Sequence, residues 1–160
     1  VAMQTLQYER GAAAGAAGGQ SQVRVSINDL IDDLRSLSRD GRPLLEDPVV
    51  RDHLVQLIME EKALGLADRR TQLPDLNTDY PMSLPLSYKL RVSEYQRRMR
   101  QYGLELQGGL GGLYVGDEQA VAGGFWQRAY FNNFATTIGG GTSQIQSNII
   151  GEQVLGLPKS

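Results

Sequence analysis

The feature that most constrains the fold is a helical repeat, because three stretches of the chain place apolar residues at steps of three and four. A helix with this spacing has one apolar face, which must be buried against another element. The apolar positions are Val23, Ile27, Leu30, Ile31, Leu34 and Leu37 in the first stretch, Val50, Leu54, Leu57, Ile58, Leu64 and Ala67 in the second, and Tyr88, Val92, Tyr95, Met99, Tyr102 and Leu106 in the third.

Capping and breaking residues set the expected helix ends. The first helix should end near Ser38, before the turn at residues 39–43. Asp47 is a good N-cap and Pro48 suits the first helical position, so the second helix should begin there and end before Pro74. After a loop at residues 75–83, the third helix should run from about Pro85 or Leu86 to residue 106.

Two shorter helices complete the predicted secondary structure. One should span residues 125–134, after a glycine-rich loop, and the other should run from an N-cap at Thr142 to about Leu155. Only residues 113–115 offer even a short strand candidate. We therefore predict an all-α fold, an antiparallel up-and-down four-helix-type bundle with one additional short helix, forming a single domain over residues 1–160. Because residues 1–10 already have a helical pattern, we expect a piece of a longer chain.

Composition excludes several classes of site. The chain has no cysteine, which excludes disulfides, thiolate zinc sites and cysteine nucleophiles. Its single histidine, His53, cannot build a histidine-rich metal centre, so we predict no metal site and a surface position for His53. A net charge of -2 argues against a strongly cationic nucleic-acid binder. The basic residues of the third helix, Lys89, Arg91, Arg97, Arg98 and Arg100, lie off its apolar stripe and are expected on a solvated face or on a face that meets an acidic neighbour.

Glu9, directly before Arg10, is the first candidate for chemistry. On a helix it shares a face with Leu6, Ala13 and Ala16 or Ala17. Small apolar neighbours would desolvate the carboxylate and raise its pKa, which suits a general base. An exposed ion pair is the alternative interpretation, and spacing alone favours it.

The second candidate is the run Gly139-Gly140-Gly141-Thr142 before the last helix. The chain has 19 glycines, where average usage predicts about 11, and many lie in residues 11–19, 108–112 and 139–141. Glycine lets a ligand approach the backbone closely, and the amide groups at a helix start attract anions. Thr142 and Gln144 would add hydrogen bonds to a ribose or adenine, although a plain loop with a helix cap explains the same residues.

Three segments, in the right order, resemble the C-terminal domain of acyl-CoA dehydrogenases. Residues 140–158, GGTSQIQSNIIGEQVLGLP, closely resemble the terminal signature of that family. Residues 1–12, VAMQTLQYERGA, are similar to the start of the long first helix of the family's C-terminal domain. Residues 41–44 followed by 47–51 are similar to the next junction in many bacterial members. The resemblance implies an all-α bundle that follows an N-terminal helical domain and a middle β-domain.

The resemblance also implies FAD as cofactor. By motif position, Gly141, Thr142 and Gln144 match nucleotide contacts of the terminal signature. Gly109 and Gly111 fall near the turn that approaches the FAD of a neighbouring subunit. The family's frequent Arg-x-x-Phe-Gly segment is absent after the first helix, where the chain has Arg39 and Arg42 instead.

The implied reaction is α,β-dehydrogenation of an acyl-CoA, with hydride transfer to FAD. Many members carry the catalytic glutamate directly before the Gly-Thr of the signature, where this chain has Gly140. Other members carry it on the first helix before an arginine, which is the position of Glu9 here. The resemblance therefore makes Glu9 the expected catalytic base.

Partners follow from the resemblance as well. It implies an acyl-CoA substrate, an electron-transferring flavoprotein as acceptor, and a homodimer or homotetramer. From the residues themselves we expect no membrane span, because no window approaches 18 uncharged apolar residues, and no nucleic-acid partner. We also expect a cytoplasmic location. A non-catalytic subunit that completes a partner's FAD site in a heteromeric complex is the alternative.

Overall fold

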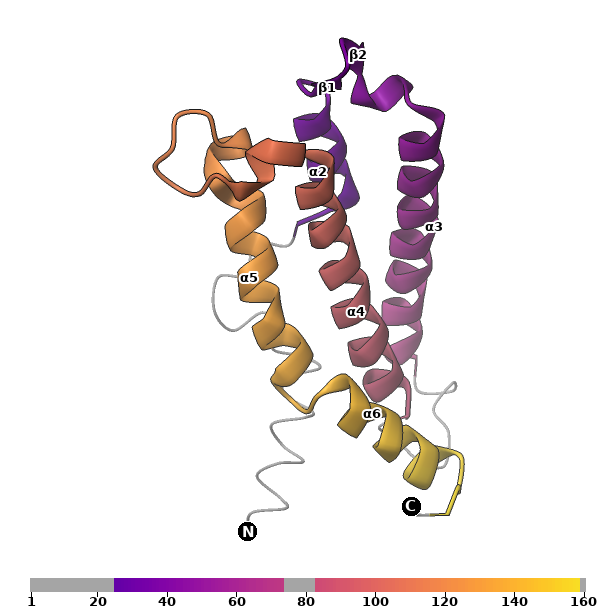
Figure 1. The fold of residues 1–160 in the computed structure, drawn as a ribbon. Coiled ribbons are helices and arrows are strands. Elements are labelled where there is room, and N and C mark those ends of the chain that lie inside the picture. The colour runs from indigo at the N-terminus through magenta and orange to yellow at the C-terminus, as the bar shows by residue number, and fades with distance from the viewer. Residues whose placement is uncertain (1–24, 74–82, 159–160) are drawn as a thin grey trace. The chain divides into compact units, whose positions relative to one another are not determined.

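The computed structural model describes residues 25–73 and 83–158, and this part of the chain is mostly helical (Figure 1). The α-helices are α2 (Ile27–Leu34), α3 (Pro48–Thr71), α4 (Ser83–Leu106), α5 (Phe125–Ile138) and α6 (Ser143–Ile149). Between them lie the short helical turns η1 (Leu44–Glu46), η3 (Gly108–Gly112) and η4 (Val121–Gly124), and a π-helical segment, η5 (Ile150–Val154), continues α6. The predicted all-α class is confirmed.

Side-chain caps fix the starts of two helices. Asp47 Oδ1 accepts hydrogen bonds from the amides of Val49 at 2.8 Å and Val50 at 3.4 Å, and Pro48 is the first residue of α3, as predicted. At α2, Ser26 and Asp29 form a capping box, in which the Asp29 amide donates to Ser26 Oγ at 3.3 Å and the Ser26 amide donates to Asp29 Oδ2 at 2.7 Å. Each cap satisfies amide groups that a helix leaves without partners at its start.

A small hairpin of two short strands forms where the sequence predicted only a turn. Strands β1 (Ser38–Arg39) and β2 (Arg42–Pro43) pair antiparallel around Asp40 and Gly41. Asp40 has φ 53° and Gly41 has φ 75°, and two consecutive left-handed residues are what a two-residue hairpin turn requires. The first helix accordingly ends at Leu34, one turn before the predicted Ser38, and residues 113–115 form no strand.

The other helix ends differ modestly from the predictions. Helix α4 begins at Ser83 rather than at Pro85 or Leu86, and α5 continues for one further turn, to Ile138. The last helix begins after Thr142, as predicted, but its hydrogen-bond pattern becomes π-helical from Ile150.

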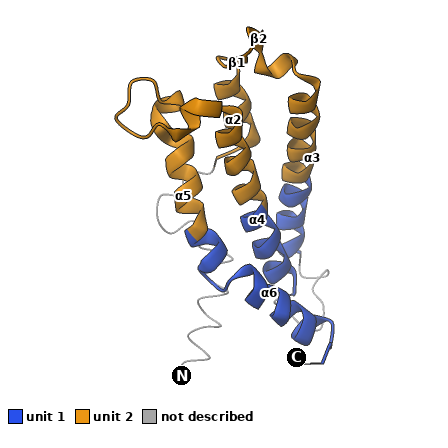
Figure 2. Ribbon diagram, in the orientation of Figure 1, with its two compact units in different colours: residues 1–23, 63–94, 135–160 blue, residues 24–62, 95–134 orange. Residues whose placement is uncertain are grey.

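The chain forms two compact units, which Figure 2 distinguishes by colour. In the described part of the second unit (residues 25–62 and 95–134), α2 packs with segments of α3, α4 and α5. Trp126, with no exposed surface, packs beside Leu30 and Gly103, and its Nε1 donates to Asp33 Oδ2 at 2.8 Å. The other nearly inaccessible apolar side chains of this unit are Leu34, Leu44, Leu57 and Met99.

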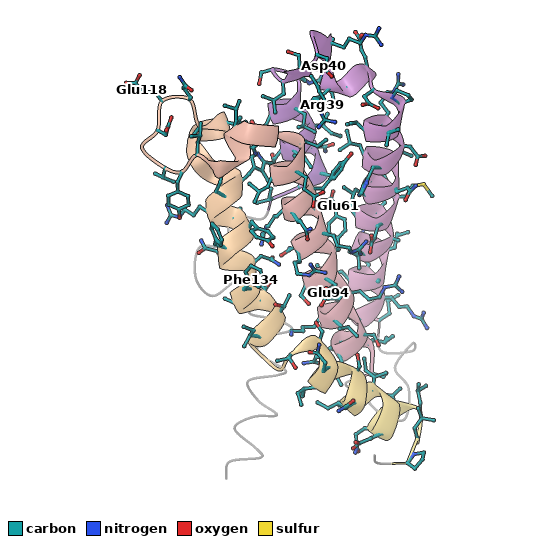
Figure 3. All side chains as sticks on the ribbon, viewed as in Figure 1. Arg39, Asp40, Glu61, Glu94, Glu118 and Phe134 are labelled. Carbon is teal, nitrogen blue, oxygen red and sulfur yellow. The ribbon has the colours of Figure 1, made fainter. Side chains whose placement is uncertain are left out.

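Polar contacts between α3 and α4 fix their relative direction within this unit. Glu61 Oε2 accepts from the Tyr95 hydroxyl at 3.3 Å, and the rings of His53 and Tyr102 stack with centroids 3.9 Å apart. Residue numbers fall along α4 as they rise along α3, so the two segments are antiparallel. Glu61, labelled in Figure 3, also accepts from the amide of Ile27 at 3.0 Å, which joins α2 to the same carboxylate.

The described part of the first unit (residues 63–73, 83–94 and 135–158) contains the end of α3, the start of α4, the end of α5, and α6 with η5. Leu64 and Leu86 are its buried apolar side chains, and it also buries Lys89 and Gln146. These last two side chains contact the glycine turn that precedes α6.

Candidate functional site

The turn at residues 139–141, predicted as a nucleotide contact, has a backbone that favours glycine. Gly140 has φ 68° and Gly141 has φ 101°, both in the left-handed region. A Cβ on Gly141 would lie 3.1 Å from Gln146 Nε2 and 3.4 Å from Ile145 Cγ2. The positive φ therefore favours glycine at position 141, and a Cβ there would also crowd the side chain of Gln146.

Two buried side chains hold the carbonyl groups of this turn. Lys89 Nζ donates to the Gly141 carbonyl at 2.6 Å, and Gln146 Nε2 donates to the Gly140 carbonyl at 2.6 Å. Lys89 is 8% exposed and Gln146 is 1% exposed. Burial lowers the pKa of the Lys89 ammonium below its ordinary 10.5, and the nearby Glu94 carboxylate opposes that shift.

The prediction that the basic residues of the third helix are solvated or meet an acidic neighbour fails for Arg100, and Lys89 is buried although it lies near Glu94. Arg100 is 3% exposed, and its guanidinium donates to Asn133 Oδ1 inside the second unit. Burial lowers the pKa of Arg100. Arg91 and Arg98 are exposed as predicted, and Arg98 pairs with Glu60 at 2.6 Å.

The first residue of α6 is tied to α4 as well. Ser143 Oγ donates to Glu94 Oε1 at 2.5 Å, and Figure 3 labels Glu94 on α4. Lys89 and Glu94 thus hold the residues on either side of Thr142 from one helix. Neither contact has a local sequence signal, because the partners lie 52 and 49 positions apart, and sequence reasoning missed both.

Thr142 is the N-cap of α6, as predicted. Its Oγ1 accepts from the Ile145 amide at 3.3 Å, which leaves the hydroxyl hydrogen to be donated elsewhere. Gln144 is exposed, so its amide is open to a ligand as donor and acceptor. Gly141, Thr142 and Gln144 therefore lie together at one half-exposed turn. Hydrogen bonds from Lys89 and Gln146 fix the backbone of this turn.

The second predicted cofactor segment lies in the other unit, at η3. Nothing lies within 4 Å of a Cβ built on Gly109, so its backbone is open to close approach. A Cβ on Gly111 would lie 2.9 Å from the Leu104 carbonyl oxygen, so Gly111 packs tightly on the end of α4. Gln127, 3% exposed, donates from Nε2 towards the Leu110 and Gly111 carbonyls at 3.4 and 3.3 Å. Buried amide groups thus hold both glycine turns, and Gln127 was another residue that the sequence did not reveal.

The remaining predicted positions divide into two groups. Glu9 and the glycine-rich residues 11–19 lie outside the described residues, so their roles stay predictions. Arg39 and Arg42 are exposed and directly opposite each other in the hairpin. His53 is exposed, as predicted, against Tyr102.

The described residues offer neither a metal-binding cluster nor a membrane-spanning helix. Within residues 25–73 and 83–158, no group of three or more His, Cys, Asp or Glu side chains is arranged to hold a metal ion. Over the same stretches, no helix combines the length and apolar character that a membrane span requires.

The family follows from the sequence over nearly its whole length. Residues 1–155 match the family model described as the acyl-CoA dehydrogenase C-terminal domain, and the chain belongs to that family. Among curated proteins, it is 33% identical over 159 residues to acyl-CoA dehydrogenase IpdE1 of Mycolicibacterium smegmatis and 30% identical over 159 residues to that of Mycobacterium tuberculosis. Each alignment covers 99% of this chain but only 36% and 38% of those proteins, so the chain spans just over a third of their length.

Two solved structures share the fold. The first, titled the ChsE4-ChsE5 complex from Mycobacterium tuberculosis, matches with a TM-score of 0.70 at 21% identity over 84% of this chain and 34% of that one. The second, titled the Tcur3481-Tcur3483 steroid ACAD G363A variant, matches with a TM-score of 0.71 at 20% identity over 97% of this chain and 39% of that one. At this identity the likeness concerns the fold.

Proposed function

We propose that the chain is the C-terminal, FAD-binding and oligomerising part of an acyl-CoA dehydrogenase, which forms the α,β double bond of an acyl-CoA thioester. The observation that carries this proposal is the family match over residues 1–155, which spans both Glu9 and the turn at Thr142. An N-terminal helical domain and a middle β-domain would supply the rest of the active site, because the curated relatives are nearly three times as long.

The residues at the two glycine turns fit a dinucleotide. Thr142 has a hydroxyl hydrogen to donate, Gln144 has an exposed amide, and the backbone at Gly109 is open. Gly141 would let the chain approach the nucleotide closely, and Gly111 would keep the second turn packed on α4. In this proposal the first turn binds FAD of its own subunit and the second binds FAD of a neighbour.

Glu9 would carry the acid–base step. Its carboxylate takes a proton from the carbon next to the thioester carbonyl, which is acidified by that carbonyl. Bound FAD supplies the acceptor for the hydride that leaves the next carbon. Because glycine occupies position 140, the family's more frequent base position, Glu9 is the carboxylate left for this role.

A second candidate is a non-catalytic subunit in a heteromeric complex. Both solved structures carry titles that pair two differently named proteins, which favours this alternative over an unrelated helical module. Arg39 and Arg42, exposed and adjacent, would then contact the diphosphate of FAD held largely by the partner. The acceptor proposed for either form is an electron-transferring flavoprotein, and the proposed location is the cytoplasm.

The test uses full-length protein that carries this domain. We expect it to copurify with flavin and to reduce a dye with some member of an acyl-CoA panel, which should include a steroid-bearing thioester because one fold neighbour is titled a steroid ACAD. Glu9→Gln should abolish turnover and retain FAD, while the exposed-loop control Glu118→Gln should leave both unchanged. Full turnover by Glu9→Gln would remove Glu9 from the reaction, and absence of flavin even with a partner subunit would contradict the proposal.

A further inference from the structure

Helix α4 holds the candidate nucleotide turn at two points that flank Thr142. On one side, Lys89 Nζ donates to the Gly141 carbonyl at 2.6 Å. On the other side, Glu94 Oε1 accepts from Ser143 Oγ at 2.5 Å. All these residues lie in the same compact unit.

Each of these two contacts has one charged partner, the Lys89 ammonium or the Glu94 carboxylate. Hydrogen bonds with one charged partner are roughly twice as strong as neutral ones. Lys89 is only 8% exposed, and its ammonium is partly desolvated beside the Gly141 carbonyl and near the Glu94 carboxylate. Gln146, which is buried, adds a third anchor at the Gly140 carbonyl. Since Thr142 already caps α6, the turn does not require charged anchors for helix capping.

We propose that Lys89 and Glu94 are positioning residues for FAD binding, which fix the backbone on both sides of Thr142 so that its hydroxyl meets the nucleotide in one orientation. The inference rests on the proposed function, since it assigns FAD to this turn. Neither residue touches the cofactor in this account. Their contribution is that the turn is already ordered before FAD arrives, so binding costs less conformational entropy.

The test measures the FAD affinity of the full-length apoprotein by quenching of flavin fluorescence. Lys89→Met should weaken FAD binding about tenfold, the effect of losing one hydrogen bond to a charged group. The matched control is Lys62→Met, the same change at an exposed position of α3. Lys89→Arg keeps a charged donor and should recover part of the lost affinity.

A milder pair of variants tests the other contact. Ser143→Ala removes the donor to Glu94 and should weaken FAD binding about threefold, a smaller loss in keeping with a single hydroxyl. The matched control is Ser147→Ala on the same helix, where the exposed hydroxyl donates to the Ser143 carbonyl at 2.8 Å. This pair keeps the inference testable if Lys89→Met does not fold.

Amide hydrogen exchange in the absence of FAD separates positioning from general destabilisation. Lys89→Met and Ser143→Ala should accelerate exchange at residues 140–143 and leave the other helices protected as in the wild type. If the wild type binds no FAD, the proposed function fails. If the wild type binds FAD and both variants bind it equally well, or if exchange rises uniformly, only the positioning role is refuted.

Discussion

Replacing Gly103 on α4 by alanine should destabilise the protein, although alanine favours helices. The new Cβ would lie 3.0 Å from Trp126 Cε3 and 3.1 Å from Leu30 Cδ1, both closer than ordinary contact. Trp126 has no exposed surface and Leu30 is 1% exposed, so neither side chain has room to retreat. Overpacking of this kind costs about 1–3 kcal/mol, against a helix-propensity gain of about 1 kcal/mol. The net loss in the free energy of unfolding should be about 0–2 kcal/mol.

Gly65→Ala is the matched control, because Gly65 lies inside α3 and a Cβ at this position would have no neighbour within 4 Å. It should stabilise the protein by about 0.5–1 kcal/mol. Urea denaturation of both variants gives the difference between them, which isolates the packing cost at about 1–3 kcal/mol. If Gly103→Ala proves as stable as Gly65→Ala, that result would contradict the tight packing of α2, α4 and α5 around Trp126.

Two further predictions concern Tyr95 and the turn before α6. Burial, reinforced by Glu61, raises the pKa of the Tyr95 phenol above its ordinary 10.0. The stability that Tyr95 contributes is therefore complete below pH 10, and it falls above pH 10 because the phenol then ionises in the unfolded chain. Tyr95→Phe should therefore cost about 1.5 kcal/mol at neutral pH, and urea titrations of both proteins should converge above pH 10; a constant difference would contradict this. Gly140→Glu puts a carboxylate at the family's frequent base position. Because residue 140 has φ 68°, a non-glycine residue there costs about 1–2 kcal/mol of backbone strain. When it is combined with Glu9→Gln, this substitution should restore part of the turnover in a dye-coupled assay. A double variant as inactive as Glu9→Gln would refute the idea that a glutamate at position 140 can replace Glu9 as the base.

Local signals in the sequence predicted the helix starts well. Asp47 and Thr142 accept amide hydrogen bonds from residues two or three positions away, so the cap and its partner are adjacent in the sequence. The hairpin was missed although Asp40-Gly41 is a two-residue turn signal, because its strands are only two residues long and have no alternating pattern.

Contacts between distant segments could not be predicted from periodicity. Lys89 and Arg100 lie off the apolar stripe of α4, yet polar partners on other segments bury them. The helical period of α4 indicates which residues share a face. It does not indicate that the turn before α6 and helix α5 cover a second face of α4. Gly140 and Gly141, singled out from the sequence as nucleotide contacts, have left-handed backbones, but whether they bind a nucleotide stays a prediction. The side chains that hold their carbonyl groups could be found only from the fold.

Acyl-CoA dehydrogenation by the full-length flavoprotein is tested most directly by adding an acyl-CoA under anaerobic conditions. The visible absorbance of the flavin then reports whether the flavin is reduced. We predict that a suitable acyl-CoA bleaches one flavin per active site and yields the α,β-unsaturated thioester. We also predict that Glu9→Gln retains the flavin band but is not bleached. A protein that carries flavin, alone or with its partner subunit, and that no acyl-CoA reduces would contradict the assignment of dehydrogenation to this chain.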